Sequence, residues 1–379
     1  MPGKNLAIIL LTVLLVLSLS FSSGALETND LSAILLDAET GQVLYANNAD
    51  EELPPASITK IMTVLLTMEA IENGELELTD STTISSGASS MGGSQIFLNT
   101  GDEITIEELL MAVIISSAND ASYALAEAVG GHYDYFVEMM NDRARELGME
   151  NTNFTNPHGL PDSDHYSTAR DISKMAREVV QYQEVLNWSQ IWLEYLELPD
   201  RQAMLTNTNR MILNYSGMDG LKTGYTRIAG FCLAATARQG DFRLISVVLG
   251  ADSRQQREEL TARMLDYGFE NYRQEILLAR DDEIEGILVP ESETEYVSIR
   301  PDRDLKAVVP RYEEYAVDTE MKIQSELELP ISAGTILGEA VAMVDGEEVH
   351  RSNLLAAHDI ERAGFFTRLL RRLRSLLGR

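Results

Sequence analysis

The feature that most constrains the fold is an apolar run over residues 61–71, which ends at Asn73-Gly74. Glycine at such a position is a common helix stop, so the run predicts a helix that begins near Ser57. Its apolar side chains form a broad face, so the rest of the chain must enclose this helix. The residues of that face are Ile58, Ile61, Met62, Leu65, Leu66 and Met68.

Two reactive side chains stand at the start of this helix. Ser57 and Lys60 are three residues apart, so their side chains lie on one face near the free N–H groups of the helix end. An uncharged lysine can take the proton of a serine hydroxyl, and burial or a second cation lowers the lysine pKa enough for this. Ser57 is therefore a candidate nucleophile and Lys60 its base. The alternative is a serine that only caps the helix and a lysine that only reaches solvent.

Length and charge limit the class of protein. The chain has 379 residues, which predicts two domains. Its 60 acidic and 30 basic residues give a formal charge of -30, so nucleic acid is not an expected partner. His158 and His165 belong to no ligand pattern, so no metal is predicted. The single cysteine, Cys232, excludes an intramolecular disulfide.

The first 25 residues have the pattern of an export signal. Lys4 supplies the positive start, residues 6–19 an apolar core, and Ser23-Gly24-Ala25 a small-residue cleavage site. An uncleaved anchor is the alternative, although the apolar run is shorter than the roughly 20 residues of a spanning helix. Both interpretations place the folded protein outside the cytoplasm.

Strands and helices alternate irregularly after the signal. Residues 31–37 and 43–47 predict a hairpin around Gly41, and the Ser- and Gly-rich residues 81–101 predict a surface loop. Further strands are expected at residues 218–226, 230–237 and 242–249, and a helix over residues 254–272. From Glu275 onward, short alternating runs such as 294–299 and 326–329 predict a small β domain.

A second polar motif interrupts two apolar segments. Thr105 and Glu108 match a capping box before a buried helix over residues 109–115. That helix ends at a polar turn, where Ser117 could relay a proton and Asn119 could hydrogen-bond a substrate amide and the lysine. Alternatively, Asn119 or Asp120 only caps the next helix, which is expected over residues 121–129.

A third motif, Lys222-Thr223-Gly224, lies on a predicted strand. The lysine places positive charge, the threonine hydroxyl can bind a carboxylate, and the glycine permits close approach of substrate or another segment. An ordinary edge strand with an exposed lysine is the alternative. Only six lysines occur in the chain, and Lys60 and Lys222 are two of them, which favours a functional role.

The C-terminal segment is basic and apolar on an otherwise acidic chain. Such a pattern predicts an amphipathic helix in a membrane interface, and packing against a partner or the β domain is the alternative. The apolar residues are Phe365, Phe366, Leu369, Leu370, Leu373, Leu376 and Leu377, and the basic ones Arg368, Arg371, Arg372, Arg374 and Arg379.

The three motifs occur once each and in this order, which resembles the D-alanyl-D-alanine carboxypeptidases, the low-molecular-mass penicillin-binding proteins. The resemblance spans about residues 28–377. It is carried by Ala56-Ser57-Ile58-Thr59-Lys60-Ile61-Met62-Thr63, Ser117-Ala118-Asn119-Asp120-Ala121, Asn156-Pro157-His158-Gly159-Leu160 and Asp219-Gly220-Leu221-Lys222-Thr223-Gly224.

This resemblance implies an α+β fold, with an antiparallel sheet flanked by helices as in DD-peptidases and β-lactamases. The expected organisation is a signal peptide at residues 1–25, a catalytic domain at 26–273, a small all-β domain at 275–357 and an amphipathic anchoring helix at 358–379. It implies peptidoglycan stem peptides as substrates, β-lactams as inhibitors, no cofactor, and peripheral attachment to the outer face of the cytoplasmic membrane.

The resemblance also implies roles in a reaction that removes the terminal D-alanine. Ser57 attacks the D-Ala-D-Ala carbonyl with Lys60 as base, and the backbone N–H groups of Ser57 and Tyr225 bind the oxyanion. Ser117 passes a proton to the leaving amine, and Asn119 positions the acylated residue.

The remaining expected site residues bind substrate. Lys222 and Thr223 meet the substrate carboxylate, with Gly224 beside them and Arg257 assisting. The residue after Gly224 is often histidine in the family and is Tyr225 here, which leaves only its backbone role intact. A β-lactamase, a DD-endopeptidase and a non-catalytic wall-binding protein are the alternatives.

Overall fold

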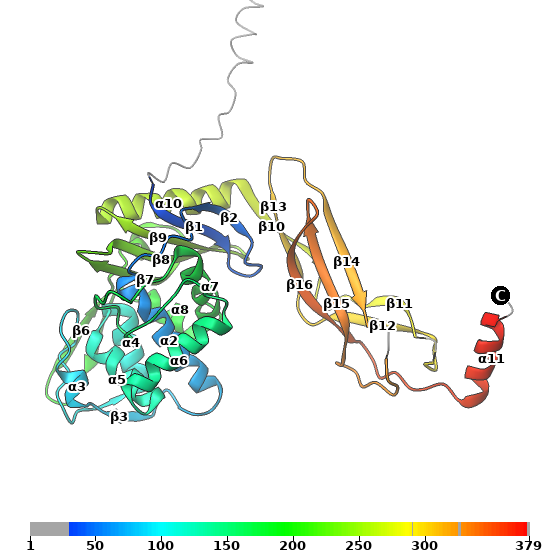
Figure 1. Ribbon diagram of the computed structural model, residues 1–379, viewed down its shortest axis with the longest axis horizontal. Helices are drawn as coiled ribbons and strands as arrows, with labels where there is room; N and C mark the ends of the chain where they lie inside the picture. The colour runs from blue at the N-terminus through cyan, green and yellow to red at the C-terminus, as the bar shows by residue number, and fades with distance from the viewer. Residues whose placement is uncertain (1–29, 290, 325–326, 377–379) are drawn as a thin grey trace, which may run out of the picture.

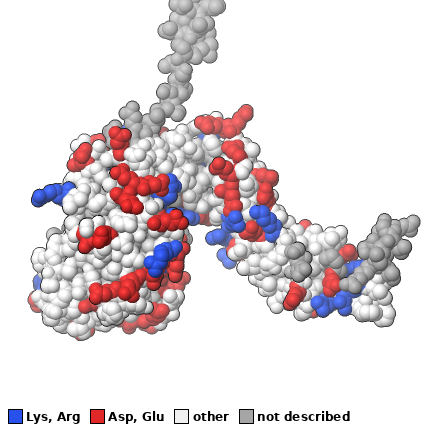
Figure 2. All heavy atoms as spheres, in the orientation of Figure 1, with Lys and Arg blue, Asp and Glu red and all other residues white. Residues whose placement is uncertain are grey.

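The computed structural model describes residues 30–289, 291–324 and 327–376, and the expected signal segment falls outside this range. Within the described residues, no helix is both long and apolar enough to cross a membrane. The chain forms a larger α+β body, an elongated β body, and a helix at the far end of the latter (Figure 1). Acidic side chains are spread over the larger body, and basic ones gather near the junction (Figure 2).

A five-stranded antiparallel sheet is the frame of the larger body. Its order is β2-β1-β9-β8-β7, so strands from the start of the chain pair with strands made much later. Ala33 of β1 lies opposite Val248 of β9, for example. The strands are β1 (Ser32–Asp37), β2 (Val43–Asn47), β7 (Met218–Thr226), β8 (Gly230–Gln239) and β9 (Phe242–Ala251).

Alternation along the strands divides the interior into two cores. Ala33 and Leu35 join the core under α10, whereas Ile34 and Leu36 join the larger core around the nucleophile helix. Successive strand side chains point to opposite faces, so β1 can be fully buried between two helical layers. The helices are η1 (Ala56–Thr59), α2 (Lys60–Glu72), α3 (Ser86–Ser89), α4 (Ile106–Ser116), α5 (Asn119–Gly130), α6 (Tyr133–Glu146), α7 (Ala169–Val179), α8 (Gln183–Ser189), α9 (Met211–Asn214) and α10 (Arg254–Asn271).

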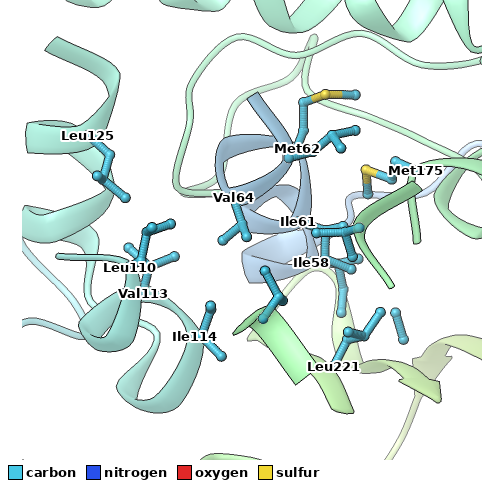
Figure 3. Packing of buried hydrophobic residues seen from close by; sticks show 14 of the residues in the cluster. Ile58, Ile61, Met62, Val64, Leu110, Val113, Ile114, Leu125, Met175 and Leu221 are labelled. Carbon is cyan, nitrogen blue, oxygen red and sulfur yellow. The ribbon is translucent and has the colours of Figure 1, made fainter. Parts of the chain in front are cut away.

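Helix α2 lies in the larger core, as its apolar run predicts. Met62 and Leu65 have no exposed surface, and every residue of the predicted apolar face is buried. Side chains from α4, α5, α7 and β7 surround it, among them Val113 and Leu221 (Figure 3). The helix ends at the C-cap Asn73, and Gly74 follows with a φ of 74°. The Ser57–Lys60 motif at the start of α2 is therefore attached to a helix that is packed on all sides.

Two local predictions need correction. The expected loop over residues 81–101 contains strand β3 (Ser81–Thr83), which pairs with β4 (Glu103–Thr105). It also contains helix α3, whose first turn is capped by the Ser85 side chain accepting from Ala88 N. A second short ribbon, β5 (Leu193–Glu197) with β6 (Gln202–Thr206), lies elsewhere in this body. The predicted strand 326–329 is not a strand at 327–329, and residue 326 is outside the described range. Pro330 lacks the N–H that a ladder needs, and Leu329 is buried in the β body.

The β body contains a five-stranded sheet and a two-stranded ribbon. The sheet order is β11-β12-β16-β15-β14, and the ribbon pairs β10 with β13. These strands are β10 (Tyr272–Leu278), β11 (Ile284–Leu288), β12 (Tyr296–Pro301), β13 (Leu305–Pro310), β14 (Val317–Ile323), β15 (Ile336–Val344) and β16 (Glu347–Ala356).

The turn between β1 and β2 joins the two bodies. Gln42 exchanges two hydrogen bonds with the backbone of Val308, at 2.9 and 3.0 Å. Lys306 forms a salt bridge of 2.8 Å with Glu39, and Val308 belongs to the core under α10. The β10–β13 ribbon is thus packed directly on the five-stranded sheet of the larger body.

The last helix, α11 (Phe365–Leu376), contacts the β body through arginines. Arg371 donates to the carbonyls of Ser292 and Glu293, and Arg368 pairs with Glu291 at 3.7 Å. Side chains beyond residue 371 are outside the described part of the structure. Within it, the apolar residues Phe365, Phe366, Leu369 and Leu370 are all exposed.

Candidate active site

Ser57 lies in η1, a 3-10 turn that leads into α2. Ala56 has a φ of 49°, and the turn is tied by Thr59 Oγ1, which donates to Ala56 O at 2.8 Å. His165 supports this turn: its Nδ1 accepts from Thr155 N at 3.0 Å, so its Nε2 carries the proton and donates to Thr59 Oγ1 at 2.7 Å. Burial lowers the pKa of His165 to about 4, so this histidine is a neutral structural group.

Lys60 is fully buried and points at the nucleophile. Its Nζ lies 3.2 Å from Ser57 Oγ, 2.7 Å from Asn119 Oδ1 and 2.6 Å from the carbonyl oxygen of His158. A neutral amine has two N–H groups and one lone pair. If Asn119 and His158 accept the two N–H groups, the lone pair faces the Ser57 hydroxyl, so the fixed acceptors orient the base.

The environment of Lys60 also favours the neutral form. Burial lowers its pKa well below the usual lysine value, and the nearby charge of Lys222 lowers it further. Asp120 opposes this shift, but its carboxylate accepts the backbone N–H groups of Ile96 and Leu98 at about 3.1 Å. Burial and the charge of Lys222 therefore both favour the neutral amine that a base requires.

A rigid turn presents the His158 carbonyl to Lys60. Asn156 Oδ1 accepts from the backbone N of Gly159 at 2.7 Å, and Pro157 O accepts both Thr63 Oγ1 and Ser122 Oγ. Neither a backbone carbonyl nor its supporting amide has a sequence signature of its own. The Asn156–Leu160 segment was nevertheless among those that carry the family resemblance.

Two glycines let the surrounding segments approach η1. A Cβ on Gly159 would lie 1.9 Å from Ala56 O, and the φ of Gly159 is 81°. A Cβ on Gly224 would lie 2.9 Å from Pro55 O. Gly224 thus allows strand β7 to pass directly beside the nucleophile turn.

Ser117 and Asn119 occupy the junction between α4 and α5. Ser117 has left-handed backbone angles, φ 61° and ψ 34°, and is 5% exposed. Ala118 is the N-cap of α5, so the alternative in which Asn119 or Asp120 serves as the cap is wrong. The Asn119 side chain instead accepts from Lys60 and donates to Gly92 O at 2.6 Å.

Strand β7, which passes beside the nucleophile turn η1, carries Lys222 and Thr223. Lys222 is 3% exposed, and burial with the nearby charge of Arg257 lowers its pKa to about 7. Thr223 Oγ1 donates to Thr208 Oγ1 at 2.7 Å, a partner that the sequence did not indicate. Tyr225 is 57% exposed and its ring lies against Phe231, 4.4 Å between centroids.

Arg257 lies on α10 beneath the sheet. It is 2% exposed and donates to Cys232 O at 3.4 Å and to Glu258 at 3.0 Å. Its Nε is buried without a hydrogen-bond partner in the described structure. Among the described residues, no hydrogen bond or ion pair joins Arg257 to the other candidate residues, although its charge lowers the pKa of Lys222. Its predicted contact with a substrate carboxylate stays a prediction.

The arrangement can perform nucleophilic acyl transfer. It combines a partly exposed serine, a buried lysine at hydrogen-bond distance and a second buried lysine whose charge acts on the first. Among the described residues, no group of three or more His, Cys, Asp or Glu side chains could hold a metal ion.

Comparisons with known proteins agree with this chemistry. The model of the D-alanyl-D-alanine carboxypeptidase family matches residues 20–253, and that of the penicillin-binding protein 5 C-terminal domain matches residues 272–362. The carboxypeptidase DacF of Bacillus subtilis is 40% identical over 342 residues, which cover 90% of this chain and 88% of the relative.

Similar structures extend the match to both bodies. Penicillin-binding protein 5 from Haemophilus influenzae is 30% identical with a TM-score of 0.74, covering 87% of this chain and 97% of that one. Penicillin-binding protein 6B from Escherichia coli is 28% identical with a TM-score of 0.69, covering 89% and 98%. The family resemblance and the predicted α+β fold with a small all-β domain are confirmed, and the chain belongs to the D-alanyl-D-alanine carboxypeptidase family.

Proposed function

We propose that the protein is a serine-type D-Ala-D-Ala carboxypeptidase that removes the terminal D-alanine from peptidoglycan stem peptides. The observation that carries this proposal is the geometry of Lys60. Its amine lies 3.2 Å from Ser57 Oγ and also donates hydrogen bonds to Asn119 Oδ1 and to the carbonyl oxygen of His158. The family match supports the substrate class.

Acylation starts when Ser57 Oγ attacks the carbonyl carbon between the two D-alanines and its proton passes to Lys60 Nζ. The backbone N–H groups of Ser57 and Tyr225 stabilise the oxyanion, a contribution worth about 3–4 kcal/mol per donor in comparable sites. The C–N bond then breaks as Lys60 passes this proton on through the Ser117 hydroxyl to the leaving nitrogen, so free D-alanine departs and Lys60 is neutral again. An ester on Ser57 remains.

Deacylation repeats the chemistry with water. Lys60 removes a proton from the attacking water, the ester C–O bond breaks, and the proton returns to Ser57 Oγ. Lys222 and Thr223 bind the C-terminal carboxylate of the substrate during acylation, and the charge of Arg257 beneath the sheet assists. No step requires a cofactor.

β-Lactams are the expected inhibitors because they present a strained amide to the same serine. Penicillin-binding protein D2 from Listeria monocytogenes, 30% identical with a TM-score of 0.57, has been solved in an ampicillin-bound form and covers 64% of this chain. This relative supports the expectation that penicillin acylates Ser57.

Time-resolved intact mass spectrometry with a penicillin, paired with an assay of D-alanine release, tests the proposal. We expect a slowly decaying adduct that maps to Ser57, D-alanine release from a stem pentapeptide, and loss of both in Ser57→Ala. Rapid penicillin consumption without a lasting adduct would instead indicate a β-lactamase. Cleavage of cross-linked wall without release of terminal D-alanine would indicate an endopeptidase.

We further propose that the protein is exported and held on the outer face of the cytoplasmic membrane by α11. Two observations support this: Phe365, Phe366 and Leu370 are more than 60% exposed, and arginines make up the polar side of the segment. Such helices bind membranes through apolar burial and attraction to anionic lipid. The signal pattern of residues 1–25 supports export.

A further inference from the structure

A cavity of about 550 Å³ opens beside the nucleophile turn, and no step of the proposed reaction uses it. Ala56 and Gly159 form the wall nearest to Ser57, and Thr226 at the end of β7 forms another wall. The cavity therefore adjoins the place where the acyl-enzyme would form.

The direction of β7 indicates which part of the substrate reaches this cavity. In the proposed reaction the leaving D-alanine places its carboxylate at Lys222 and Thr223, and the reacting carbonyl lies at the N–H of Tyr225. Strand β7 then continues to Thr226 and is the last strand in the sheet order, so an extended peptide can align with its outer edge. The retained part of the stem peptide thus extends from Ser57 toward the cavity.

The lining combines apolar surface with negative charge. Leu160 and Ile228 are apolar, and Ile228 is 74% exposed. Glu52 and Asp162 supply two exposed carboxylates, and no lysine or arginine belongs to the lining. One oxygen of Asp162 accepts the backbone N–H of Asp164 at 2.9 Å, which orients the carboxylate. An aliphatic chain that ends in an ammonium group matches both features.

We propose that this cavity binds the side chain of the residue before D-Ala-D-Ala, and that Glu52 and Asp162 select a side chain with a free terminal ammonium. This inference rests on the proposed function and adds its substrate preference. A stem peptide whose amine is already acylated, as in a cross-link, loses the charge that the two carboxylates attract. The enzyme therefore prefers stems that are not cross-linked through this amine.

The test compares two synthetic peptides, Nα-acetyl-L-lysyl-D-Ala-D-Ala and its Nε-acetylated form, by kcat/KM for D-alanine release at low salt. Exposed ion pairs contribute modestly, so each carboxylate is expected to favour the free amine by up to about fivefold. We expect the ratio of the two kcat/KM values to fall in Glu52→Gln and in Asp162→Asn, and to approach one in the double variant.

Glu51→Gln is the matched control, because Glu51 precedes Glu52 and is not part of the lining. Its ratio is expected to equal that of the wild type. A wild-type ratio of one, or an equal fall in the control, would overturn the inference while leaving the carboxypeptidase intact. Absence of D-alanine release from both peptides would instead refute the proposed function, and the substrate preference with it.

Discussion

The contact between Gly224 and the nucleophile turn makes Gly224→Ala an informative perturbation. The new Cβ would lie 2.9 Å from Pro55 O and 3.2 Å from both Ala56 Cβ and Ile58 Cγ1. The first neighbour is backbone, which cannot rotate away, so β7 and η1 must separate by roughly half an ångström to restore an ordinary contact.

The expected size of the effect follows from this separation. Overpacking in a dense interior costs about 1–3 kcal/mol, and alanine recovers about 0.5–1 kcal/mol relative to glycine in a strand. The free energy of unfolding should therefore fall by about 1–2 kcal/mol. A misplacement of about 1 Å can slow catalysis roughly a hundredfold, so half of that displacement predicts about a tenfold slower acylation of Ser57.

Acylation by a fluorescent penicillin and unfolding in urea measure the two effects separately. Gly92→Ala is the control, because Gly92 is also near the site but a Cβ there meets no atom within 4 Å. The control should acylate within about twofold of the wild type, as neutral surface substitutions do. If Gly224→Ala acylates as fast as the control, β7 and η1 are not in the contact that the structure shows.

Two further outcomes are expected. Lys222→Met should abolish activity and raise the free energy of unfolding at pH 6.5 by a few kcal/mol. Burial lowers the pKa of Lys222 from 10.5 to about 7, so the folded state of the wild type is penalised for holding the charged form. Between pH 7 and 10.5 the unfolded chain holds a proton on Lys222 that the folded chain has lost, so the wild type gains stability as the pH rises. The difference in unfolding free energy between variant and wild type, measured in urea, should therefore be smaller at pH 9 than at pH 6.5. Equal stability of the two proteins at pH 6.5 would contradict this prediction. Ending the chain at Gly364, which keeps the buried Ile360 and Ala363, should release the protein from anionic vesicles in a flotation assay, and unchanged binding would refute the anchor.

Local sequence patterns predicted much of the scaffold around the site. The apolar run after Lys60 identified α2, and the capping box of Thr105 and Glu108 is present with both of its hydrogen bonds. Strands β1 and β2 differ from their predicted bounds by at most one residue. These patterns succeed because the burial period and the cap chemistry are encoded by neighbouring residues.

Other parts depend on contacts between distant segments, which a single sequence does not show. The carbonyl of His158 orients Lys60, yet any residue type has a carbonyl, so only the fold reveals this role. Thr208 is a partner of Thr223 through a contact across 15 residues of chain. Asn119 looked equally suited to a cap, and only the Ala118 N-cap shows that its side chain is free to hold Lys60.

The pairing of β1 with β9 also determines when the enzyme can become reactive. Ser32 lies opposite Leu249, so the first strand to be synthesised has to wait for one of the last strands of the catalytic body. Such distant pairing delays folding, because the chain between the partners must be ordered before the contact forms. An unfinished chain carries the Ser57 motif without the strand that holds Lys222 beside it. The site is thus complete only when the late strands β7, β8 and β9 have joined β1 in one sheet.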